Sequence, residues 1–599
     1  MQEFIKTIKS FPDMVRKAYM VHKIAFKQSP WIIISYLFLS LIGSLIPYTR
    51  NFVQGNIINI LQTGERSYAV FAFPLIVFMV IIVLPSILMV FQIFCNKIFF
   101  YKITQYFDNK IINKSVEVDP QLHEDKNYTN LVNKVSDKGV YVLGNFYENF
   151  WALILNLVTL AISAVTLYHF SRISMVIMIF TTLPTLFVQI SYGRSSWFIW
   201  GNDVDTEKRK KYWAYRKYFQ EFSTYIELKL TEAREYFRLF RSSFLEEVYI
   251  KQLKNEKNLR SSGFVSELIA QAGILSIFII LFKQVLSNQL QVGSFIFVLS
   301  VVLTFTATLV FTFKILSSLY PDYMYIKDLY EFLNVEPKIK NTGTKTLTSV
   351  PPVIEFRNVS FSYPGTNKTI LKDFSLTINA GDKVAVIGLN GAGKTTFVKL
   401  LCRFYDVTKG EILLNGINIM EYDLESWYKN IGVLFQEYGK YHIPLEDLIS
   451  LGRYTGTIDH KKLLNSLKIA EADFVKSLPN KEKTQLGKEY TDGVDVSVGQ
   501  WQKLAIARMF YRDPSVMVLD EPTSSIDAEA EAKIFETLEK FSKDKTIIMI
   551  SHRFSTVRNA NTIAVIKEGA LHEYGTHEQL IKNKDEYARL FHLQAEGYK

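Results

Sequence analysis

The hydrophobic residues of this chain gather in six long stretches within its first half. They cover residues 31–48, 69–94, 151–168, 173–190, 265–282 and 295–316. Each is close to the ~20 residues that an α-helix needs to cross the apolar core of a bilayer. Buried helices of a soluble core are the alternative, but six stretches of this length in one chain argue against it. The pattern predicts an all-α membrane domain with six spanning helices.

The lysine and arginine residues predict how these helices are oriented. The connections after the second and fourth stretches are long and basic, whereas the other three are short and carry few basic residues. Because basic loops stay on the cytoplasmic side, we expect both long loops and both termini in the cytosol of a multi-pass protein of the cytoplasmic membrane. The loops read as helical, with chain reversals near residues 124–131 and 225–232.

The formal net charge of +11 follows mainly from this topology. Nucleic-acid binding is the competing interpretation of a basic protein. We do not expect it, because the charges flank apolar spans. The two cysteines, Cys95 and Cys402, are too few and too far apart to form a disulfide framework.

Polar segments divide the chain into four parts. Residues 1–29 predict an amphipathic helix at the surface of membrane lipids, with apolar side chains at helical spacing: Phe4, Ile5, Ile8, Phe11 and Val15. Residues 336–352 are polar with Gly and Pro and predict a linker. The membrane domain would then cover residues 30–335, and a second domain residues 353–599.

The second domain contains the sequence GLNGAGKT at residues 388–395, between an apolar run and a helix-like segment. A glycine-rich loop between a strand and a helix exposes backbone N–H groups to phosphates. Lys394 would reach the β- and γ-phosphates of a nucleotide, and the Thr395 hydroxyl would ligate Mg²⁺. Taken alone, the motif is also compatible with an ordinary glycine-rich turn.

Two further apolar strands end in residues with catalytic chemistry. Residues 516–519 lead into Asp520 and Glu521, and residues 546–550 lead into Ser551 and His552. Ligands of an open α/β sheet bind at the carboxyl ends of its strands. We expect Asp520 to hold Mg²⁺ through water, Glu521 to deprotonate the attacking water, and His552 to contact the γ-phosphate.

With these motifs in place, residues 353 to about 595 resemble the ATP-binding cassette (ABC) family, which implies an α/β P-loop nucleotide-binding domain that uses ATP. The resemblance assigns adenine stacking to Tyr363, a loop at the dimer interface to Asp527, and catalysis to Glu521 and His552. It implies that the signature residues Ser497, Gly499 and Gln500 act on a partner's nucleotide. The implied ATP-binding set is Tyr363, Gly388, Asn390, Gly391, Gly393, Lys394, Thr395, Thr396 and Gln436, with Thr395, Gln436 and Asp520 as Mg²⁺ ligands.

Six spans with long loops after the second and fourth resemble the exporter class of half-transporters. The sequences GVDVSVGQWQKLAIAR and VLFQEYGKYHIPLEDLI look closest to exporters of lanthionine peptides and their relatives. The resemblance implies ATP-driven export of a peptide. A lipid or amphipathic drug is the alternative cargo, and an ATP-gated protein that transports nothing is the alternative class. An intact Glu521 and His552 favour turnover over gating.

One residue departs from the family pattern LSGGQ, because Val498 replaces the first glycine. A β-branched side chain there would crowd the partner's phosphate and resist unusual backbone angles, unless the variant is simply tolerated. In heterodimeric exporters an imperfect signature often accompanies an intact glutamate and histidine. The partner would therefore be a second half-transporter, in a homodimer or, as Val498 suggests, a heterodimer.

Polar residues inside the spans are candidates for a functional role, because burying them in a membrane is costly. They are Asn156, Gln189, Glu267 and Gln271, with Glu148 just outside the third span. Hydrogen bonds between helices and snorkelling to the membrane interface are the alternative roles.

Overall fold

The computed structural model describes the whole chain except residues 1, 65–66, 139–140, 202, 349, 522–532, 535, 538–543, 552–556 and 597–599. It divides into two compact units. The first comprises Met1–Val118 and His123–Glu336, and the second Asp119–Leu122 and Pro337–Lys599.

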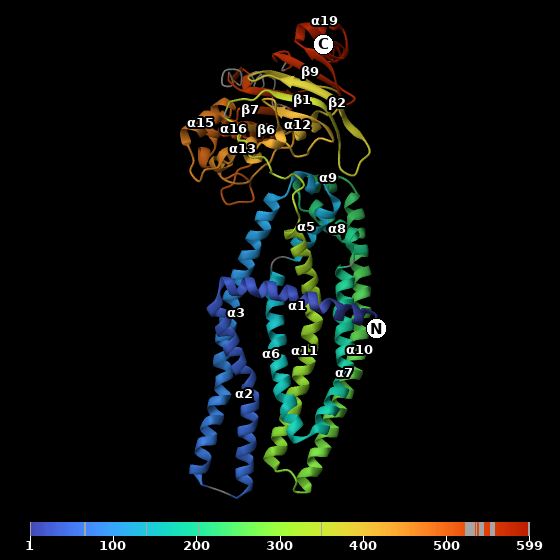
Figure 1. Ribbon diagram of the computed structural model, residues 1–599, viewed down its shortest axis with the longest axis vertical. Coiled ribbons are helices and arrows are strands. Elements are labelled where there is room, and N and C mark those ends of the chain that lie inside the picture. The colour runs from blue at the N-terminus through green and yellow to red at the C-terminus, as the bar shows by residue number, and fades with distance from the viewer. Residues whose placement is uncertain are drawn as a thin grey trace. The chain divides into compact units, whose positions relative to one another are not determined.

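Six long helices dominate the first unit, which confirms the predicted all-α membrane domain. Within the described residues six helices are long and apolar enough to cross a membrane, and they run side by side (Figure 1). They are α2 (Pro30–Gln62), α3 (Tyr68–Glu117), α6 (Tyr141–Phe170), α7 (Arg172–Gly201), α10 (Ala233–Leu286) and α11 (Val292–Leu333). At 1.5 Å per residue, the 50 residues of α3 and 54 of α10 extend well beyond a bilayer core of about 30 Å.

Contacts between these helices use both apolar packing and close backbone approach. Leu167, Met178 and Ile277 are fully buried and join α6, α7 and α10 in one cluster. At the contact of α2 with α11, the side chain of Asn59 accepts a hydrogen bond from the N–H of Gly293 (2.7 Å). A Cβ atom on Gly293 would lie 2.0 Å from a backbone oxygen of α2, so only glycine fits here.

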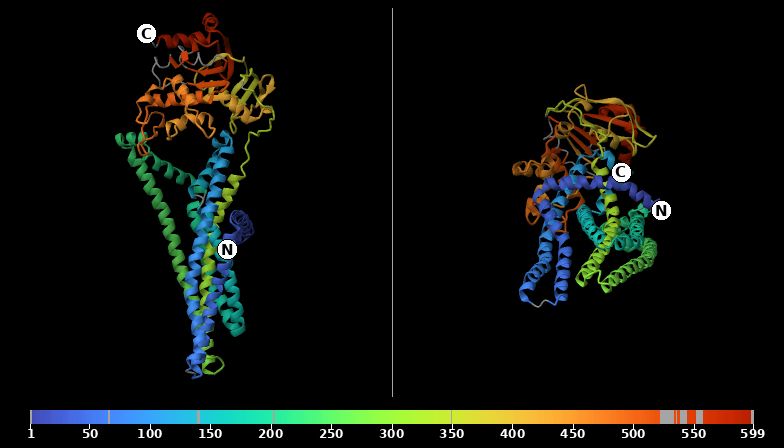
Figure 2. Two further views of the ribbon diagram at one scale, coloured as in Figure 1. Left: turned by 90° about the vertical axis from the view of Figure 1, so that its left-hand side faces the viewer. Right: turned by 60° about the horizontal axis from the view of Figure 1, so that its bottom comes forward.

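The N-terminal residues form helix α1 (Gln2–Gln28), which crosses the long helices in Figure 1 and is seen nearly end-on in the left view of Figure 2. Its packed face carries Met14, Ala18, Val21 and Ala25, all buried. Phe11 and Val15, expected on the apolar face, are exposed. The small alanines allow α1 to lie close to the bundle, and Phe11 and Val15 remain on the outside.

Short helices form the two long loops, which the sequence predicted to be helical. They are α4 (Pro120–His123), α5 (Lys126–Lys138), α8 (Asp203–Tyr218) and α9 (Phe222–Leu230). The first reversal lies at residues 118–125, earlier than the expected 124–131, because a residue that precedes a proline is disfavoured in helical conformation and α3 ends before Pro120. In the second loop, α9 occupies most of the expected turn.

Two sheets form the framework of the second unit. The first is antiparallel, in the order β2 (Thr369–Ile378), β1 (Ile354–Ser362), β4 (Lys409–Leu414) and β5 (Ile417–Asn418). The second runs β10 (Ala570–Gly575), β9 (Thr562–Lys567), β3 (Lys383–Ile387), β8 (Thr546–Ile550), β7 (Val516–Asp520) and β6 (Ile431–Leu434). Only β10 pairs antiparallel in it.

Helices cover these sheets and supply the rest of the core. They include α12 (Lys394–Leu401), α13 (Leu424–Asn430), α14 (Leu445–Ser450), α15 (His460–Ile469), α16 (Val498–Arg512), α19 (His577–Asn583) and α20 (Glu586–Glu596). Phe356, Phe374 and Phe397 join β1, β2 and α12 in one aromatic contact. Trp427 of α13 is buried and donates its indole N–H to the carbonyl of Leu401 (2.9 Å). This is the α/β domain that the sequence predicted.

Candidate functional site

The candidate site lies at one edge of the mixed sheet. Strands β3, β8, β7 and β6 are neighbours and parallel, so their carboxyl ends meet at the same edge. The residues that follow these strands are Gly388, Ser551, Glu521 and, two positions after β6, Gln436. Since ligands bind at the carboxyl ends of such strands, the topology unites motifs that are up to 163 residues apart in the sequence.

The phosphate loop combines left-handed backbone angles with a helix N-terminus. Gly391 (φ 81°) and Gly393 (φ 112°) adopt the conformation that favours glycine. A side chain on Gly388 would meet the backbone oxygen of Ile566 at 2.4 Å. The loop leads directly into α12, and the N–H groups at a helix start can receive an anion. The backbone therefore has the features of a phosphate cradle.

Lys394 is buried at the base of this loop. Its Nζ donates to the carbonyls of Gly388 (2.7 Å) and Leu389 (3.1 Å). Burial lowers the pKa of Lys394, while the charges of Glu521 and Asp520 act in the opposite direction. The cation is thus fixed between the loop and the two acidic residues at the end of β7.

Asp520 and Glu521 differ in their surroundings. Asp520 is buried, and burial together with the charge of Glu521 raises its pKa to about 6, against the effect of Lys394. Glu521 adopts a left-handed backbone (φ 50°), and its N–H donates to the carbonyl of Ile550 (2.9 Å). Its Oε2 accepts a hydrogen bond from Gln436 Nε2 (3.0 Å). The strained turn therefore directs the Glu521 carboxylate toward the segment after β6.

The oxygen groups near this carboxylate suit a hard divalent cation. Thr395 is exposed in the first turn of α12, which follows β3, and Asp520 is the last residue of β7. Hydroxyl, carboxylate and amide oxygens are the ligands that Mg²⁺ prefers. Thr395, Asp520 and Gln436 thus fit the magnesium ion that accompanies a nucleotide, which would neutralise charge on the phosphates.

The signature segment forms the start of α16. Ser497 caps the helix, its Oγ accepts from the N–H of Gln500 (3.2 Å), and the Gln500 side chain accepts from the N–H of Ser497 (2.8 Å). Val498 is the first residue of α16, its φ is not positive, and it is 54% exposed. The backbone strain expected at Val498 is therefore not found, and any effect of this residue has to come from the bulk of its side chain.

Other expected positions are described only in part. Tyr363 hydrogen-bonds Thr396 through their hydroxyl groups (3.1 Å), and its ring contacts Tyr405 (5.3 Å between centroids). This ring packing fixes Tyr363 beside α12. His552 and Asp527 lie outside the described residues, so their expected roles stay predictions.

The structure also reveals contacts that sequence patterns did not indicate. The Tyr438 hydroxyl donates to the carbonyl of Val498 (3.2 Å) and so ties the segment after Gln436 to the signature helix. In the loop after α3, the Asp119 carboxylate accepts from the N–H groups of Lys338 and Ile339 (2.9 Å for the latter). The Asp-Pro pair at 119–120 signals a helix start, but nothing in the sequence names the linker as its partner.

A groove of about 450 Å³ lies beside the same segment. Its lining includes Phe404, Tyr428, Tyr441 and Arg508. The Arg508 guanidinium lies over the Tyr441 ring (5.2 Å) and donates to the carbonyl of Gly439 (3.2 Å). The cassette therefore carries an apolar groove next to Gln436.

Taken together, the fold and the site define an ATP-binding cassette joined to a membrane domain with six spans. A family model described as "ABC transporter" matches residues 371–524. The chain belongs to the ABC transporter family, with the architecture of an exporter, and it couples ATP hydrolysis to transport.

Similar proteins cover more of the chain than the family model does. The subtilin transport ATP-binding protein SpaT of Bacillus subtilis is 29% identical over 95% of this chain and 92% of its own length. The ATP-dependent lipid A-core flippase of Haemophilus influenzae is 32% identical over 60% of this chain and 62% of its own length. A solved bacterial Atm1-family ABC exporter with ATP bound shares the fold, with a TM-score of 0.80 at 21% identity, over 94% of this chain and 98% of that one.

Proposed function

We propose that this chain is one half of a dimeric exporter that carries a peptide out of the cell. The observation that carries the proposal is the extent of the likeness to SpaT, which spans membrane domain and cassette alike at 29% identity. The matches to the lipid A-core flippase and to the multidrug export protein YgaD cover 60% and 40% of this chain. Cargo contacts belong to the membrane domain, so a likeness that includes this domain entirely weighs more.

In this proposal each of the cassette residues has a defined role. Lys394 and the loop N–H groups hold the phosphates, and Thr395, Asp520 and Gln436 hold Mg²⁺. Glu521 accepts a proton from the attacking water, and the hydrogen bond from Gln436 orients its carboxylate. His552 contacts the γ-phosphate. These assignments extend the observed geometry by the chemistry of phosphoryl transfer.

A Glu521→Gln substitution tests the role of the base. Glutamine has nearly the same shape and can still accept the hydrogen bond from Gln436, so the fold is expected to survive. Loss of a general base typically lowers the rate by about 10²–10⁴-fold. We expect ATP hydrolysis to fall within this range and ATP to be retained in a closed dimer. Normal turnover by the variant would disprove the assignment.

The dimer supplies the second half of each nucleotide site. The N-terminus of α16 carries Ser497, Gly499 and Gln500, and its N–H groups would face the partner's γ-phosphate, where a helix dipole favours negative charge. Asp527 would lie at the same interface. Because Val498 changes this surface, we propose a heterodimer with one strong and one weak site. Equal turnover at both sites of a purified homodimer would argue against it.

The membrane topology of the proposal places the cassette and both termini in the cytosol, as the basic loops indicate. The helix α9 includes the sequence TYIELKL at residues 224–230. Its side chains Tyr225, Ile226 and Leu230 are exposed. We propose that this segment docks in the apolar groove of the partner's cassette and transmits its closure to the spans.

A cavity of about 670 Å³ in the membrane domain is the proposed cargo contact. Its lining includes Gln189, Arg260, Glu267 and Lys314, so two of the polar residues expected to be functional meet there. A third, Gln271, donates a hydrogen bond to Glu267 (2.8 Å). Charges of both signs in one cavity suit a peptide, which carries cationic and anionic groups, better than a neutral lipid chain.

Transport assays on the chain in proteoliposomes distinguish these cargoes. We expect a charged amphipathic peptide to stimulate ATP hydrolysis and to be transported, and Glu267→Gln to weaken the stimulation about tenfold, since a charged hydrogen bond contributes about 1.5–3 kcal/mol. Glu246→Gln, which replaces an exposed carboxylate elsewhere on α10, is the matched control. Stimulation by lipid or neutral dye with no response to peptide would favour the alternative cargo.

A further inference from the structure

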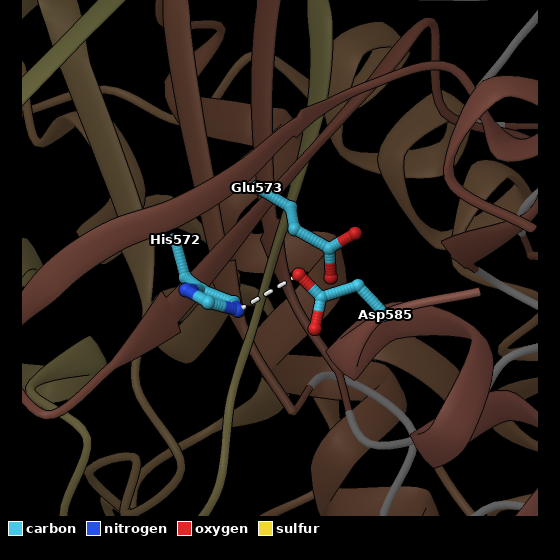
Figure 3. Close-up of side chains that lie close together, drawn as sticks. All are labelled: His572, Glu573 and Asp585. Carbon is cyan, nitrogen blue, oxygen red and sulfur yellow. Dashed lines mark ion pairs between the residues drawn. The ribbon is translucent and has the colours of Figure 1, made fainter. Parts of the chain in front are cut away.

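A cluster of metal-binding side chains lies at the C-terminal end of the cassette, apart from the nucleotide site. His572, Glu573 and Asp585 each offer one ligand atom, and these atoms lie within 4.8 Å of one another. Figure 3 shows the three side chains pointing toward a common point, His572 and Glu573 from β10 and Asp585 from the residue before α20. None of them belongs to the proposed catalytic machinery.

Two irregularities of the backbone create this arrangement. Neighbouring residues of a strand normally point to opposite faces. The pairing of β10 with β9 shifts between Leu571 and Glu573, so His572 is an extra residue in a β-bulge. A bulge re-aims side chains, which lets His572 and Glu573 share one side. Lys584 adopts a left-handed conformation (φ 56°) that ends α19 and brings Asp585 back to the strand.

A salt bridge within the cluster does not explain why the carboxylate of Glu573 is buried. Its side chain is 92% buried, since only 8% of its surface is exposed. Its Oε2 accepts a hydrogen bond from the N–H of Tyr587 (2.7 Å), but its Oε1 is buried without a hydrogen-bond partner among the described residues. A buried carboxylate oxygen without a partner is costly, and a cation at this position would satisfy it.

The basic side chains near the cluster are paired with another carboxylate. Asp585 pairs with His572 (3.1 Å). The nearby cations Lys567 and Arg589 are both bound by Glu586, at 3.2 and 2.5 Å. In the described part of the chain, two carboxylates therefore face a single imidazole.

We propose that His572, Glu573 and Asp585 form a binding site for a divalent transition-metal ion of the zinc class. One imidazole nitrogen and two carboxylate oxygens are ligands that Zn²⁺ accepts, whereas Mg²⁺ and Ca²⁺ prefer oxygen alone. Zinc–ligand distances of about 2.0–2.2 Å require the ligand atoms to approach by roughly 1 Å. Rotation of the two more exposed side chains, His572 and Asp585, allows this. The bound ion would fasten α20 to β10.

Zinc titration of the purified full-length protein tests this proposal. The protein is stripped with a chelator, kept free of nucleotide and Mg²⁺, and titrated with Zn²⁺ against a chromophoric chelator. We expect one Zn²⁺ site per chain that is weakened at least tenfold by Glu573→Gln, by Asp585→Asn and by His572→Gln. His592→Gln, which removes an exposed histidine from α20, should leave the site unchanged. Replacement by Co²⁺ should produce a visible absorption band that the three variants lose.

The variants separate metal binding from folding. Glutamine at position 573 can still accept the Tyr587 hydrogen bond, and basal ATP hydrolysis measured without Zn²⁺ should stay at the wild-type rate. Zn²⁺ should raise the melting temperature of the wild type but not of the variants, because it binds only the folded site. Equal Zn²⁺ affinity of wild type and all three variants, or no wild-type binding below millimolar Zn²⁺, would overturn the proposal. Equal competition by Mg²⁺ would overturn the assignment to the zinc class.

Discussion

Replacement of Val498 by glycine restores the first glycine of the family signature and tests whether this position limits the partner's site. Val498 is the first residue of α16, with a helical backbone and half of its side chain exposed. Removing the side chain therefore loses little buried surface. The difference in helix propensity between valine and glycine is only a few tenths of a kcal/mol, so the cassette should remain folded.

The expected gain follows from the geometry of the helix start. If the isopropyl group keeps the N–H groups of α16 from the partner's γ-phosphate, its removal restores about one hydrogen bond to a charged group. Such a bond contributes about 1.5–3 kcal/mol, which corresponds to roughly a 10–150-fold change in rate. We predict that Val498→Gly raises the maximal ATPase rate at least tenfold, and that Val498→Ala, which keeps a methyl group, gives a smaller rise.

The assay is steady-state ATP hydrolysis by the chain in lipid nanodiscs, with melting temperature measured in parallel. Val350→Gly removes a valine that is 66% exposed in the linker and serves as the matched control. Rates of both Val498 variants within twofold of wild type would refute the crowding argument. The signature would then work with valine, and this residue would no longer support a heterodimer.

Three further predictions concern stability. Asp520→Asn should abolish ATP hydrolysis yet stabilise the cassette by about 1–2 kcal/mol at pH 7.5. The pKa of Asp520 in the folded protein, about 6, exceeds its unfolded value, so the stability of the wild type falls as pH rises from about 4 to 6. The stability gain of the variant over the wild type, measured in thermal scans, should therefore vanish below about pH 4. Gly293→Ala should lower the melting temperature of the membrane domain and impair transport, since its Cβ would clash with α2. Gly263→Ala, with open space around the added Cβ, should leave the melting temperature unchanged, and equal melting of the two variants would contradict the α2–α11 contact. Trp427→Ala should destabilise the cassette by about 3–5 kcal/mol, measured by denaturant unfolding, and a loss below 1 kcal/mol would show that the core collapses around the missing ring.

The sequence predicted the large elements because their signals are local. The six apolar stretches predict six spans because the length of ~20 apolar residues is set by the bilayer and not by neighbouring helices. GLNGAGKT likewise predicts a phosphate loop, because its glycines and Lys394 act within one turn of chain. Element boundaries were predicted less well: the reversal after α3 depends on Pro120, and it lies about six residues earlier than the sequence analysis predicted.

The tertiary structure decided what depends on contacts between distant segments. Only strand order brings Gln436 to Glu521, and only helix packing selects Ala18 and Ala25 of α1 as buried while Phe11 and Val15 stay exposed.

The cluster of His572, Glu573 and Asp585 shows most directly what the tertiary structure decides. Read as a strand, β10 would send His572 and Glu573 to opposite faces, and no pattern in the sequence links them to Asp585. A bulge and a left-handed residue, each stabilised by the surrounding fold, bring the three together. The sequence by itself therefore determined which chemistry this protein carries, in motifs that are complete within a few residues. The tertiary structure decided which side chains meet, because long-range pairing is set by packing energies that no short window of sequence contains.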